Sequence, residues 1–446
     1  MNKILIANRG EIAVRIIRAC KEMNIKTVAV YSEIDKDALH AKLADEAICI
    51  GPAESSKSYL NIKSIMEAAN ITKADAIHPG FGFLSENSLF AKICEESNIK
   101  FIGPSSKVIE LLGNKSNAKQ LIKEAGIPVI PGSDGAIRDI DKAVKVAEKI
   151  GYPIMIKASS GGGGKGIRIV KNKKELMNNF NIVKQEAKIS FNDDEIYLEK
   201  FIENPRHIEI QILADEHGNI VHLGERDCTI QRNNQKIIEE TPSTIVDTRL
   251  RDKMGRTAIK IAKLVGYTSC GTVEFLVDAD KNFYFMEMNT RIQVEHPITE
   301  MRTGLDLVKK QIKIAAGEKL DIRQRNIKFD GHVIECRINA ENPNKKFMPC
   351  PGKINGLLLP GGNGIRIDTA VYDGYTIPHT YDSMIIKIIA KGANRNEAIS
   401  KMKRSLEELV VDGVDTNRDF LFDIIKTTDF IRGDFDTSFI TKNFKI

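Results

Sequence analysis

The stretch from Tyr152 to Lys171, YPIMIKASSGGGGKGIRIVK, decides the fold of the middle of the chain. Two segments, YPIMIKA and GIRIVK, are typical of β-strands, and four consecutive glycines stand between them. Gly161, Gly163 and Gly166 satisfy G-x-G-x-x-G, but a strand follows where a dinucleotide-binding loop needs a helix. No Gly-Lys-Ser/Thr closes a Walker-type loop either. We therefore predict a strand–loop–strand hairpin whose glycines let backbone N–H groups approach phosphate.

Two lysines accompany this loop. Lys157 ends the first strand and Lys165 lies within the loop, so both can meet phosphate charge. A flexible surface turn remains the alternative interpretation, although four consecutive glycines between two strands cost considerable chain entropy.

A second predicted hairpin, GTVEFLVDADKNFYFMEMN at 271–289, brings two carboxylates together. With its turn centred at 280–281, Glu274 lies directly opposite Glu287, where like charges destabilise a sheet. A divalent cation between them would remove the conflict, and oxygen ligands of this kind suit Mg²⁺ or Mn²⁺. Asn289 falls on the same face and could supply a third oxygen. Two solvated glutamates on an exposed face remain the alternative.

Polar residues continue to alternate beyond this hairpin. Arg291, Gln293 and Glu295 alternate with Ile292 and Val294. This run is dense in groups that could hold and deprotonate a small oxyanion, and Glu295 with Arg291 forms a plausible pair of general base and anion anchor.

The segment HIEIQILAD at 207–215 is an alternating strand with His207, Glu209 and Gln211 on one face. That face can look into a nucleotide cleft or into solvent, and the pattern leaves both interpretations open. Lys236, within QRNNQK, is equally undecided, because a solvated lysine is the more common case.

The pattern of strands and helices along the rest of the sequence indicates how the chain is divided. Strand–helix alternation over the first hundred residues predicts a parallel, doubly wound sheet. Its first turn, NRGE at 8–11, lacks the glycine motif of dinucleotide sites, so bound NAD is not expected. From 114 to 317 hairpin-linked strands dominate, and beyond residue 331 more strands and two helical runs follow.

Composition narrows the class of protein. A chain of 446 residues with 42% hydrophobic and 28% charged residues is expected to be a soluble enzyme of about three domains. Seven cysteines without a CxxC pair disfavour a disulfide framework or a zinc site and favour a reducing cytoplasm. The N-terminus is interpreted as a strand and not a signal peptide, and no segment suits a membrane span. A net charge of +6 without a dense basic block gives no reason to expect nucleic-acid binding.

Several motifs resemble the biotin carboxylase family over residues 6–414: NRGEIAVRIIRA, HPGFGFLSEN, IKASSGGGGKG, ENPRHIEIQ, EMNTRIQVEHPITE and YDSMIIK. EMNTRIQVEHP alone is highly specific. The resemblance implies an α/β fold with a Rossmann-like N-terminal domain (1–113), an ATP-grasp core (114–330) carrying a mobile glycine-rich lid at about 131–203, and a mixed α+β C-terminal domain (331–446).

The resemblance also implies a reaction in two stages. ATP phosphorylates bicarbonate to carboxyphosphate, which carboxylates N1′ of biotin attached to a separate carrier protein. The implied nucleotide contacts are Lys115, Lys157, Gly163, Gly164, Glu199, Lys200, Phe201, Ile202, His207, Gln231, Asn234 and Leu276. Glu274, Glu287 and Asn289 would bind Mg²⁺ or Mn²⁺. Bicarbonate would be held by Lys236, Arg291, Gln293 and Val294. Glu295 would act as the base, and Arg337 would stabilise the biotin enolate.

Two positions depart from the family pattern. The family usually carries Arg-Arg-His ahead of 235–236, whereas 232–234 are Arg-Asn-Asn here, which puts one expected nucleotide contact in doubt. Asn234 can still donate a hydrogen bond. The lid has Lys165 where arginine is frequent, so the charge remains but the bidentate geometry is lost.

The resemblance implies further partners and leaves alternatives. We expect a carboxyl carrier protein, a carboxyltransferase and a homodimer, with fatty acid (malonyl-CoA) synthesis as the setting, although pyruvate or another acyl-CoA could be the final acceptor. No Ala-Met-Lys-Met biotinylation motif is present; the nearest string begins at Met402 in a predicted helix. Another ATP-grasp ligase, such as a carbamoyl-phosphate or peptide ligase, would share the lid and the metal hairpin but not RIQVEHP. A non-catalytic nucleotide sensor would not need Glu295.

Overall fold

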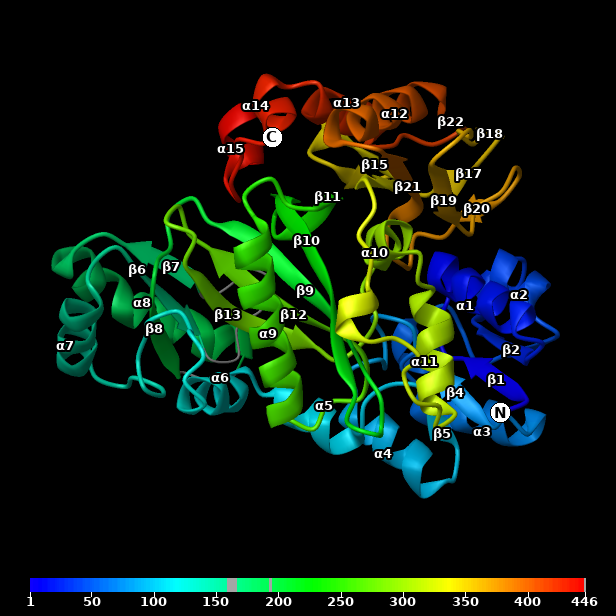
Figure 1. The fold of residues 1–446 in the computed structure, drawn as a ribbon, viewed down its shortest axis with the longest axis horizontal. Coiled ribbons are helices and arrows are strands. Elements are labelled where there is room, and N and C mark those ends of the chain that lie inside the picture. The colour runs from blue at the N-terminus through cyan, green and yellow to red at the C-terminus, as the bar shows by residue number, and fades with distance from the viewer. Residues whose placement is uncertain (159–166, 192–194, 445–446) are drawn as a thin grey trace.

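The computed structural model describes residues 1–158, 167–191 and 195–444. These residues form an N-terminal parallel sheet, a large antiparallel sheet, a small sheet that projects from the rest, and a C-terminal layer of helices (Figure 1). None of the described helices combines the length and the apolar character that a membrane crossing requires.

The N-terminal part is a five-stranded parallel sheet in the order β3-β2-β1-β4-β5. Its strands are β1 (Lys3–Ile6), β2 (Lys26–Tyr31), β3 (Glu46–Cys49), β4 (Ala76–His78) and β5 (Lys100–Phe101). Its helices are α1 (Gly10–Glu22), α2 (Leu39–Leu43), α3 (Ile62–Thr72), α4 (Ser88–Glu96) and α5 (Ser106–Gly113). Ile4 and Ile6 pack into one core while Leu5 packs into another, so both faces of the sheet are covered. This burial explains the continuous apolar run of β1 and confirms the predicted doubly wound sheet.

The central sheet has eight antiparallel strands in the order β13-β12-β9-β10-β11-β14-β21-β19. They are β9 (Arg206–Ala214), β10 (Ile220–Arg232), β11 (Gln235–Thr241), β12 (Ser269–Val277), β13 (Phe283–Asn289), β14 (His332–Asn339), β19 (Ile365–Thr369) and β21 (Met384–Gly392). The even-numbered isoleucines of β9 pack against helix α9 (Thr248–Leu264). The opposite face of β9, with His207, Glu209 and Gln211, is buried as well, so the solvent-face interpretation was wrong.

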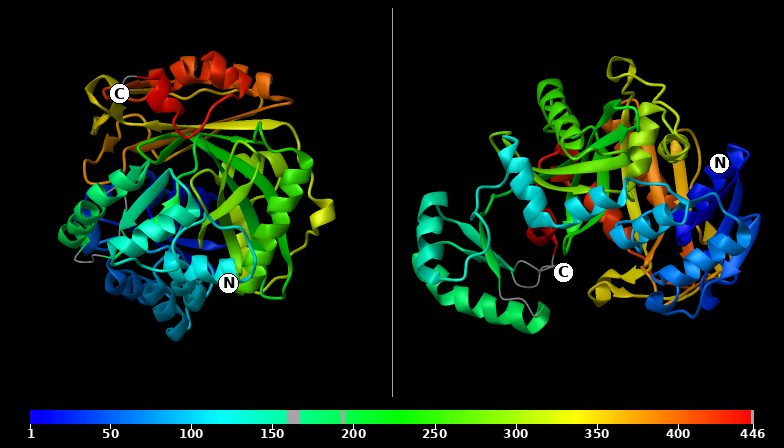
Figure 2. Two further views of the ribbon diagram at one scale, coloured as in Figure 1. Left: turned by 90° about the vertical axis from the view of Figure 1, so that its left-hand side faces the viewer. Right: turned by 90° about the horizontal axis from the view of Figure 1, so that it is seen from below.

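A small three-stranded sheet, β7-β6-β8, forms a projecting arm of the molecule (Figure 2). It consists of β6 (Ile154–Ala158), β7 (Ile167–Val170) and β8 (Ile196–Lys200), and α7 (Ile140–Ile150) and α8 (Lys173–Phe191) pack on one face. The antiparallel pairing of β6 with β7 confirms the hairpin predicted from the glycine-rich stretch. The loop itself, with Gly163, Gly164 and Lys165, lies outside the described residues.

The C-terminal part combines strands with helices, as expected. Its helices are α12 (Arg395–Glu408), α13 (Arg418–Ile425), α14 (Thr428–Arg432) and α15 (Phe439–Asn443). Three short pairs complete it: β15 (Glu341–Asn342) with β16 (Met348–Pro349), β17 (Gly352–Lys353) with β20 (Thr376–Ile377), and β18 (Gly356–Leu358) with β22 (Val410–Asp412). Of the remaining helices, α6 (Lys115–Glu124) leads from the N-terminal sheet toward the small sheet, and α10 (His296–Thr303) and α11 (Leu307–Ala315) lie between β13 and β14 of the central sheet. Because β11 pairs with β14, the central sheet crosses the predicted boundary at 330–331. The three-domain division itself stays a prediction.

Candidate active site

One large cavity of about 2790 Å³ lies between the projecting arm, the central sheet and the N-terminal part. Most of the residues singled out from the sequence line it: Lys157, Glu199, Lys200, Phe201, Ile202, His207, Gln231, Asn234, Lys236, Glu274, Leu276, Glu287, Asn289, Arg291, Gln293, Val294, Glu295 and Arg337. Lys115 begins α6, and its side chain is outside the described part of the structure. The fold therefore gathers residues that are up to 180 positions apart, from Lys157 to Arg337, around one space.

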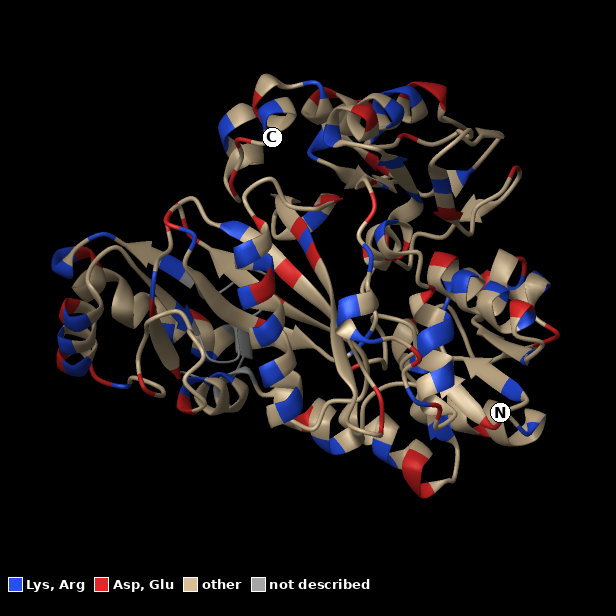
Figure 3. Ribbon diagram, in the orientation of Figure 1, with Lys and Arg blue, Asp and Glu red and all other residues tan. Residues whose placement is uncertain are grey.

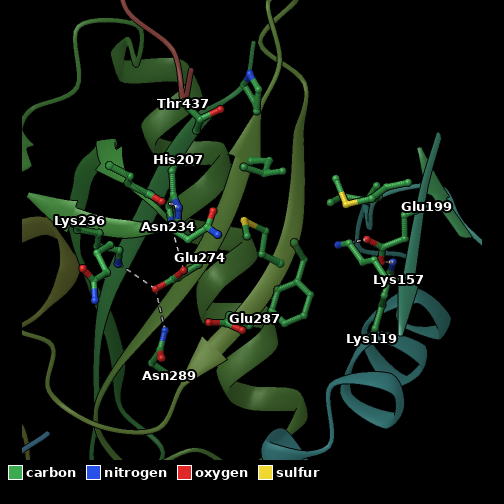
Figure 4. A pocket seen from close by; sticks show the side chains of 18 of the residues that line it. Lys119, Lys157, Glu199, His207, Asn234, Lys236, Glu274, Glu287, Asn289 and Thr437 are labelled. Carbon is green, nitrogen blue, oxygen red and sulfur yellow. Dashed lines mark hydrogen bonds and ion pairs between the residues drawn. The ribbon is translucent and has the colours of Figure 1, made fainter. Parts of the chain in front are cut away.

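Figure 4 shows two groups of charged side chains facing each other across this cavity. Lys157 and Lys119 both bind the carboxylate of Glu199 on the side of the arm. Burial opposes ionisation of Glu199, but the two ammonium groups lower its pKa below the usual value. Lys119, on α6, was missed by the sequence analysis because nothing in its local pattern distinguishes it from a solvated helix lysine.

The opposite group is built on the hairpin of β12 and β13. Glu274 lies directly opposite Glu287, as predicted. The turn was nevertheless placed wrongly, because Phe275 pairs with Phe285 and Val277 with Phe283, one residue out of the expected register. A bulge at Met286 restores the register, and such bulges are frequent beside active sites.

Both carboxylate oxygens of Glu274 have hydrogen-bond partners. Its Oε1 accepts hydrogen bonds from Asn289 Nδ2 at 2.8 Å, Gln293 Nε2 at 2.7 Å and Lys236 Nζ at 3.1 Å. His207 Nε2 lies 2.8 Å from its Oε2, and Gln231 Nε2 lies 2.9 Å from the other ring nitrogen. His207 is thereby oriented with its Nε2–H toward the carboxylate.

Lys236 is the common cation of this group and not a solvated lysine. Its Nζ lies 2.7 Å from Glu209, 3.1 Å from Glu274 and 2.7 Å from Glu295. Burial opposes the charge, but the three carboxylates raise the pKa of Lys236 well above its usual value. In return, Lys236 is the main reason that the pKa values of Glu274 and Glu295 lie well below normal despite burial. Lys236, Glu274 and Glu295 are therefore charged at neutral pH.

The grouping of His207, Glu209 and Glu274 within 4.8 Å of one another also resembles a metal site. The ammonium group of Lys236 already neutralises Glu209 and Glu274 there. Oxygen donors for a hard cation are instead offered by Glu274, Glu287 and Asn289 together.

The segment after β13 differs from the expected strand. β13 ends at Asn289, a turn follows, and α10 begins at His296, so residues 291, 293 and 295 do not alternate along a sheet. Arg291 bonds to Glu86 (2.9 Å) and to Asn289 Oδ1 (3.0 Å), and not to Glu295. The structure thus places Arg291 beside Glu86 and Asn289, and its role as an anion anchor with Glu295 as the base stays a prediction.

The arginine that contacts Glu295 is Arg337, on β14. Its Nη2 lies 2.9 Å from Glu295 Oε2 and also binds Glu239. Burial raises the pKa of Glu239 to about 7, although Arg337 opposes this. Glu295 thus stands between two cations, Lys236 and Arg337.

A buried arginine beneath the cavity was also missed. Arg226, on β10, is fully buried and contacts Glu209, Gln211, Thr272, Thr299 and Gln293. Its bond to Gln293 Oε1 (2.8 Å) leaves Gln293 Nε2 free to reach Glu274. Acidic and basic residues lie side by side along these central strands (Figure 3). The run Glu225–Arg226–Asp227 in the middle of a predominantly buried strand was the available indication.

The departure at 232–234 has a conformational explanation. Asn233 and Asn234 form the tip of the β10–β11 hairpin with φ of 50° and 64°. Two successive positive φ values favour asparagine over most residues. Asn234 lines the cavity from this tip.

Comparison with known proteins identifies the family. Residues 1–109 match the biotin carboxylase N-terminal domain and residues 335–442 the biotin carboxylase C-terminal domain. Residues 114–323 match the ATP-binding domain of the carbamoyl-phosphate synthase L chain. The middle match is thus to a domain named for another ligase, whereas the two flanking matches distinguish biotin carboxylases.

Relatives and solved structures agree along almost the whole chain. Biotin carboxylase 1 of Bacillus subtilis is 55% identical over 441 residues, covering 99% of this chain and 98% of the relative. A pyruvate carboxylase subunit from Methanothermobacter thermautotrophicus is 53% identical over 98% of this chain and 89% of its own. The biotin carboxylase domain dimer of Hydrogenobacter thermophilus 2-oxoglutarate carboxylase, in complex with MgADP, ADP and bicarbonate, superimposes with a TM-score of 0.92 at 50% identity. That superposition covers 99% of this chain and 97% of the solved chain.

These findings confirm the α/β fold with an ATP-grasp core that the motifs implied. They also decide between the alternatives left open by the sequence, since neither a carbamoyl-phosphate ligase nor a nucleotide sensor accounts for matches at both ends. The chain belongs to the biotin carboxylase family.

Proposed function

We propose that this chain uses MgATP to phosphorylate bicarbonate and transfers the carboxyl group to N1′ of biotin on a separate carrier protein. The observation that carries the proposal is the convergence of Lys236, Glu295 and Arg337 beside the paired Glu274 and Glu287, within the same cavity as Lys157. Phosphoryl transfer of this kind depends mainly on positioning and charge neutralisation.

The nucleotide would occupy the space between the arm and the β12–β13 hairpin. Lys157 would contact its phosphates, together with Lys115 and the backbone of Gly163 and Gly164. The adenine and ribose would lie against the residues that follow β8 and the adjoining sheet: Glu199, Lys200, Phe201, Ile202, His207, Gln231, Asn234 and Leu276. Lys200 turns its ammonium group to the carbonyls of Gly151 and Tyr152, so it would meet the base through its backbone.

The carboxylates of Glu274 and Glu287 fit a divalent cation. They face each other on paired strands, and Asn289 adds an amide oxygen that now accepts a bond from Arg291. Mg²⁺ or Mn²⁺ bound there supplies positive charge beside the phosphates.

Bicarbonate would lie against Lys236, Arg291, Gln293 and the backbone of Val294. Glu295 is ionised but is a weak base while Lys236 and Arg337 both neutralise it. An incoming anion that shares Lys236 would reduce this neutralisation and raise the proton affinity of Glu295. The same arrangement would therefore make Glu295 a better base only when its substrate is bound.

Arg337 would act in the second stage. It lies in the cavity, fully ionised, beside Glu295. When biotin loses its N1′ proton, negative charge develops on the ureido oxygen, and a preorganised guanidinium stabilises such charge.

The proposal also covers the carrier protein and the final acceptor of the carboxyl group. We propose that the chain works as a homodimer in the cytoplasm with a carboxyl carrier protein and a carboxyltransferase. The proposed acceptor is acetyl-CoA, which leads to malonyl-CoA for fatty acid synthesis. Pyruvate and 2-oxoglutarate are the competing acceptors, because relatives with those names are 53% and 50% identical to this chain.

The test is ADP formation by the purified chain with and without bicarbonate and free biotin. We expect ATP cleavage to require bicarbonate and to be stimulated by biotin. Cleavage that is independent of bicarbonate would contradict the proposal. Carboxylation of the biotinylated protein that co-purifies with the chain, followed by transfer to each candidate acceptor, would decide the acceptor.

A further inference from the structure

A lysine outside the cavity lining reaches the segment proposed to hold bicarbonate. Lys387, on β21, has no exposed surface and lies between Ile386 and Ile388. Its Nζ donates a hydrogen bond to the backbone carbonyl of Val294 at 2.8 Å. It also lies 2.9 Å from Glu11 Oε1, at the start of α1, and 3.9 Å from Asp368 on β19.

Burial of this ammonium group requires an explanation. A buried charge is expensive, and a buried ion pair is often replaced by apolar residues without loss of stability. The pairing of Lys387 with Glu11 therefore does not by itself account for a lysine at this position. An apolar replacement could not make the bond to the carbonyl of Val294.

The sheet register shows what that bond accomplishes. Lys387 lies directly opposite Arg337 on the neighbouring strand β14. Arg337 binds the carboxylate of Glu295, while Lys387 binds the carbonyl of the preceding residue, Val294. Two adjacent strands thus hold two consecutive residues of the same turn.

The geometry of the peptide unit extends this effect to the site. The carbonyl of Val294 and the N–H of Glu295 belong to one planar peptide group, so fixing one fixes the other. The side chain of Val294 is apolar, so an anion at this turn would be bound by the backbone N–H groups of Val294 and Glu295, and the N–H of Glu295 belongs to the peptide unit that Lys387 fixes. The orientation of these peptide groups therefore determines how the turn meets bicarbonate.

We propose that Lys387 is a positioning residue that sets the orientation of the Val294–Glu295 peptide for bicarbonate. The ion pair with Glu11 would hold the ammonium group of Lys387 in place from the N-terminal part of the chain. The inference rests on the proposed function, because it concerns the same anion. Lys387 does not line the cavity and would act only through the turn.

The test compares Lys387→Met with Lys391→Met by steady-state kinetics. Lys391 lies on the same face of β21 and likewise donates to a carbonyl, that of Met301 at the other end of α10, at 3.0 Å. We expect Lys387→Met to raise KM for bicarbonate by about 10- to 100-fold, the effect of losing a hydrogen bond made by a charged group. KM for ATP should stay within about twofold, and Lys391→Met should change neither constant.

A double variant distinguishes a specific effect on bicarbonate binding from an effect of misfolding. Lys387→Met leaves Glu11 without its cation, whereas Lys387→Met/Glu11→Gln removes both charges of the buried pair and should restore thermal stability. It should still show the raised KM for bicarbonate. If either variant folds and has the KM for bicarbonate of the wild type, the inference is overturned. Failure of both variants to fold would also overturn it, because Lys387 would then be needed for folding. Absence of bicarbonate-dependent ATP cleavage in the wild-type chain would instead refute the proposed function.

Discussion

Replacement of Lys236 by methionine tests whether its ammonium group holds the charged cluster together. The variant keeps an unbranched side chain but leaves Glu209, Glu274 and Glu295 without their common cation, which now lies 2.7–3.1 Å from each. Removing one member of a buried ion pair costs about 3–5 kcal/mol. For a chain of this length, that loss corresponds to a fall in Tm of about 3–5 °C.

The loss should depend on pH in a defined direction. The pKa values of Glu274 and Glu295 are depressed in the folded protein, mainly by Lys236 acting against burial. Their contribution to stability is therefore fully present above the unfolded value of about 4.3 and is lost as the pH falls through the folded values. Without Lys236 both pKa values should rise, although His207 still contacts Glu274 and Arg337 still contacts Glu295. Protonation of these carboxylates then lessens the destabilisation of the variant as the pH falls. The difference in Tm between wild type and variant should be large at pH 8 and smaller at pH 5.

The assay is thermal unfolding at both pH values in Mg²⁺-free buffer, so that no divalent cation replaces the lysine. Lys426→Met is the matched control, because Lys426 is half-exposed and its ion pair with Asp423 lies on the surface at the end of α13. Lys426 also lies over the ring of Phe422, 5.4 Å from its centroid, and exposed contacts of both kinds contribute little, so the control should unfold within about 1 kcal/mol of the wild type. An equal difference in Tm at pH 8 and pH 5, or none at all, would refute the electrostatic account of Lys236.

Three further predictions concern individual steps. Glu287→Gln should abolish ATP turnover without loss of folding, because it halves the carboxylate charge offered to the metal; near-normal turnover at ordinary Mg²⁺ concentration would contradict the paired-carboxylate argument. Arg337→Ser should lower biotin carboxylation by about 10²–10³ while bicarbonate-dependent ATP cleavage largely persists; equal falls in both rates would assign Arg337 to the shared machinery. Lys119→Met should raise KM for ATP about three- to tenfold, because Glu199 would then hold Lys157 alone and would compete with the phosphates of ATP for the ammonium group of Lys157. An unchanged KM would show that Lys119 has no influence on nucleotide binding.

Local patterns predicted those features that depend on neighbours in the sequence. The apolar run of β1 and the alternation of β9 gave the elements correctly, and the pairing of Glu274 with Glu287 followed from a single hairpin. The bulge at Met286 was not predictable, because Phe285, Met286 and Met288 are all apolar and conceal the change from odd to even buried positions that the extra residue causes.

Features that depend on distant elements could not be obtained in this way. Alternation showed that Glu209 shares a face with His207, but not that Lys236 and Arg226 from other strands cover that face. Arg291 is paired with Glu86, 205 residues away, so its separation from Glu295 had no local indication. Most site residues were named by resemblance, and their roles stay predictions.

The pairing of β11 with β14 affects how this chain can be divided. A fragment ending at residue 330 would keep β11 but remove its neighbour, and would present an open row of backbone N–H and C=O groups to other molecules. Such a fragment is expected to self-associate, and its complement would carry the same defect on β14. The regions before and after residue 330 should accordingly unfold in one thermal transition. Reporter insertions and split-protein designs would be better placed in exposed loops than at the predicted boundary between residues 330 and 331.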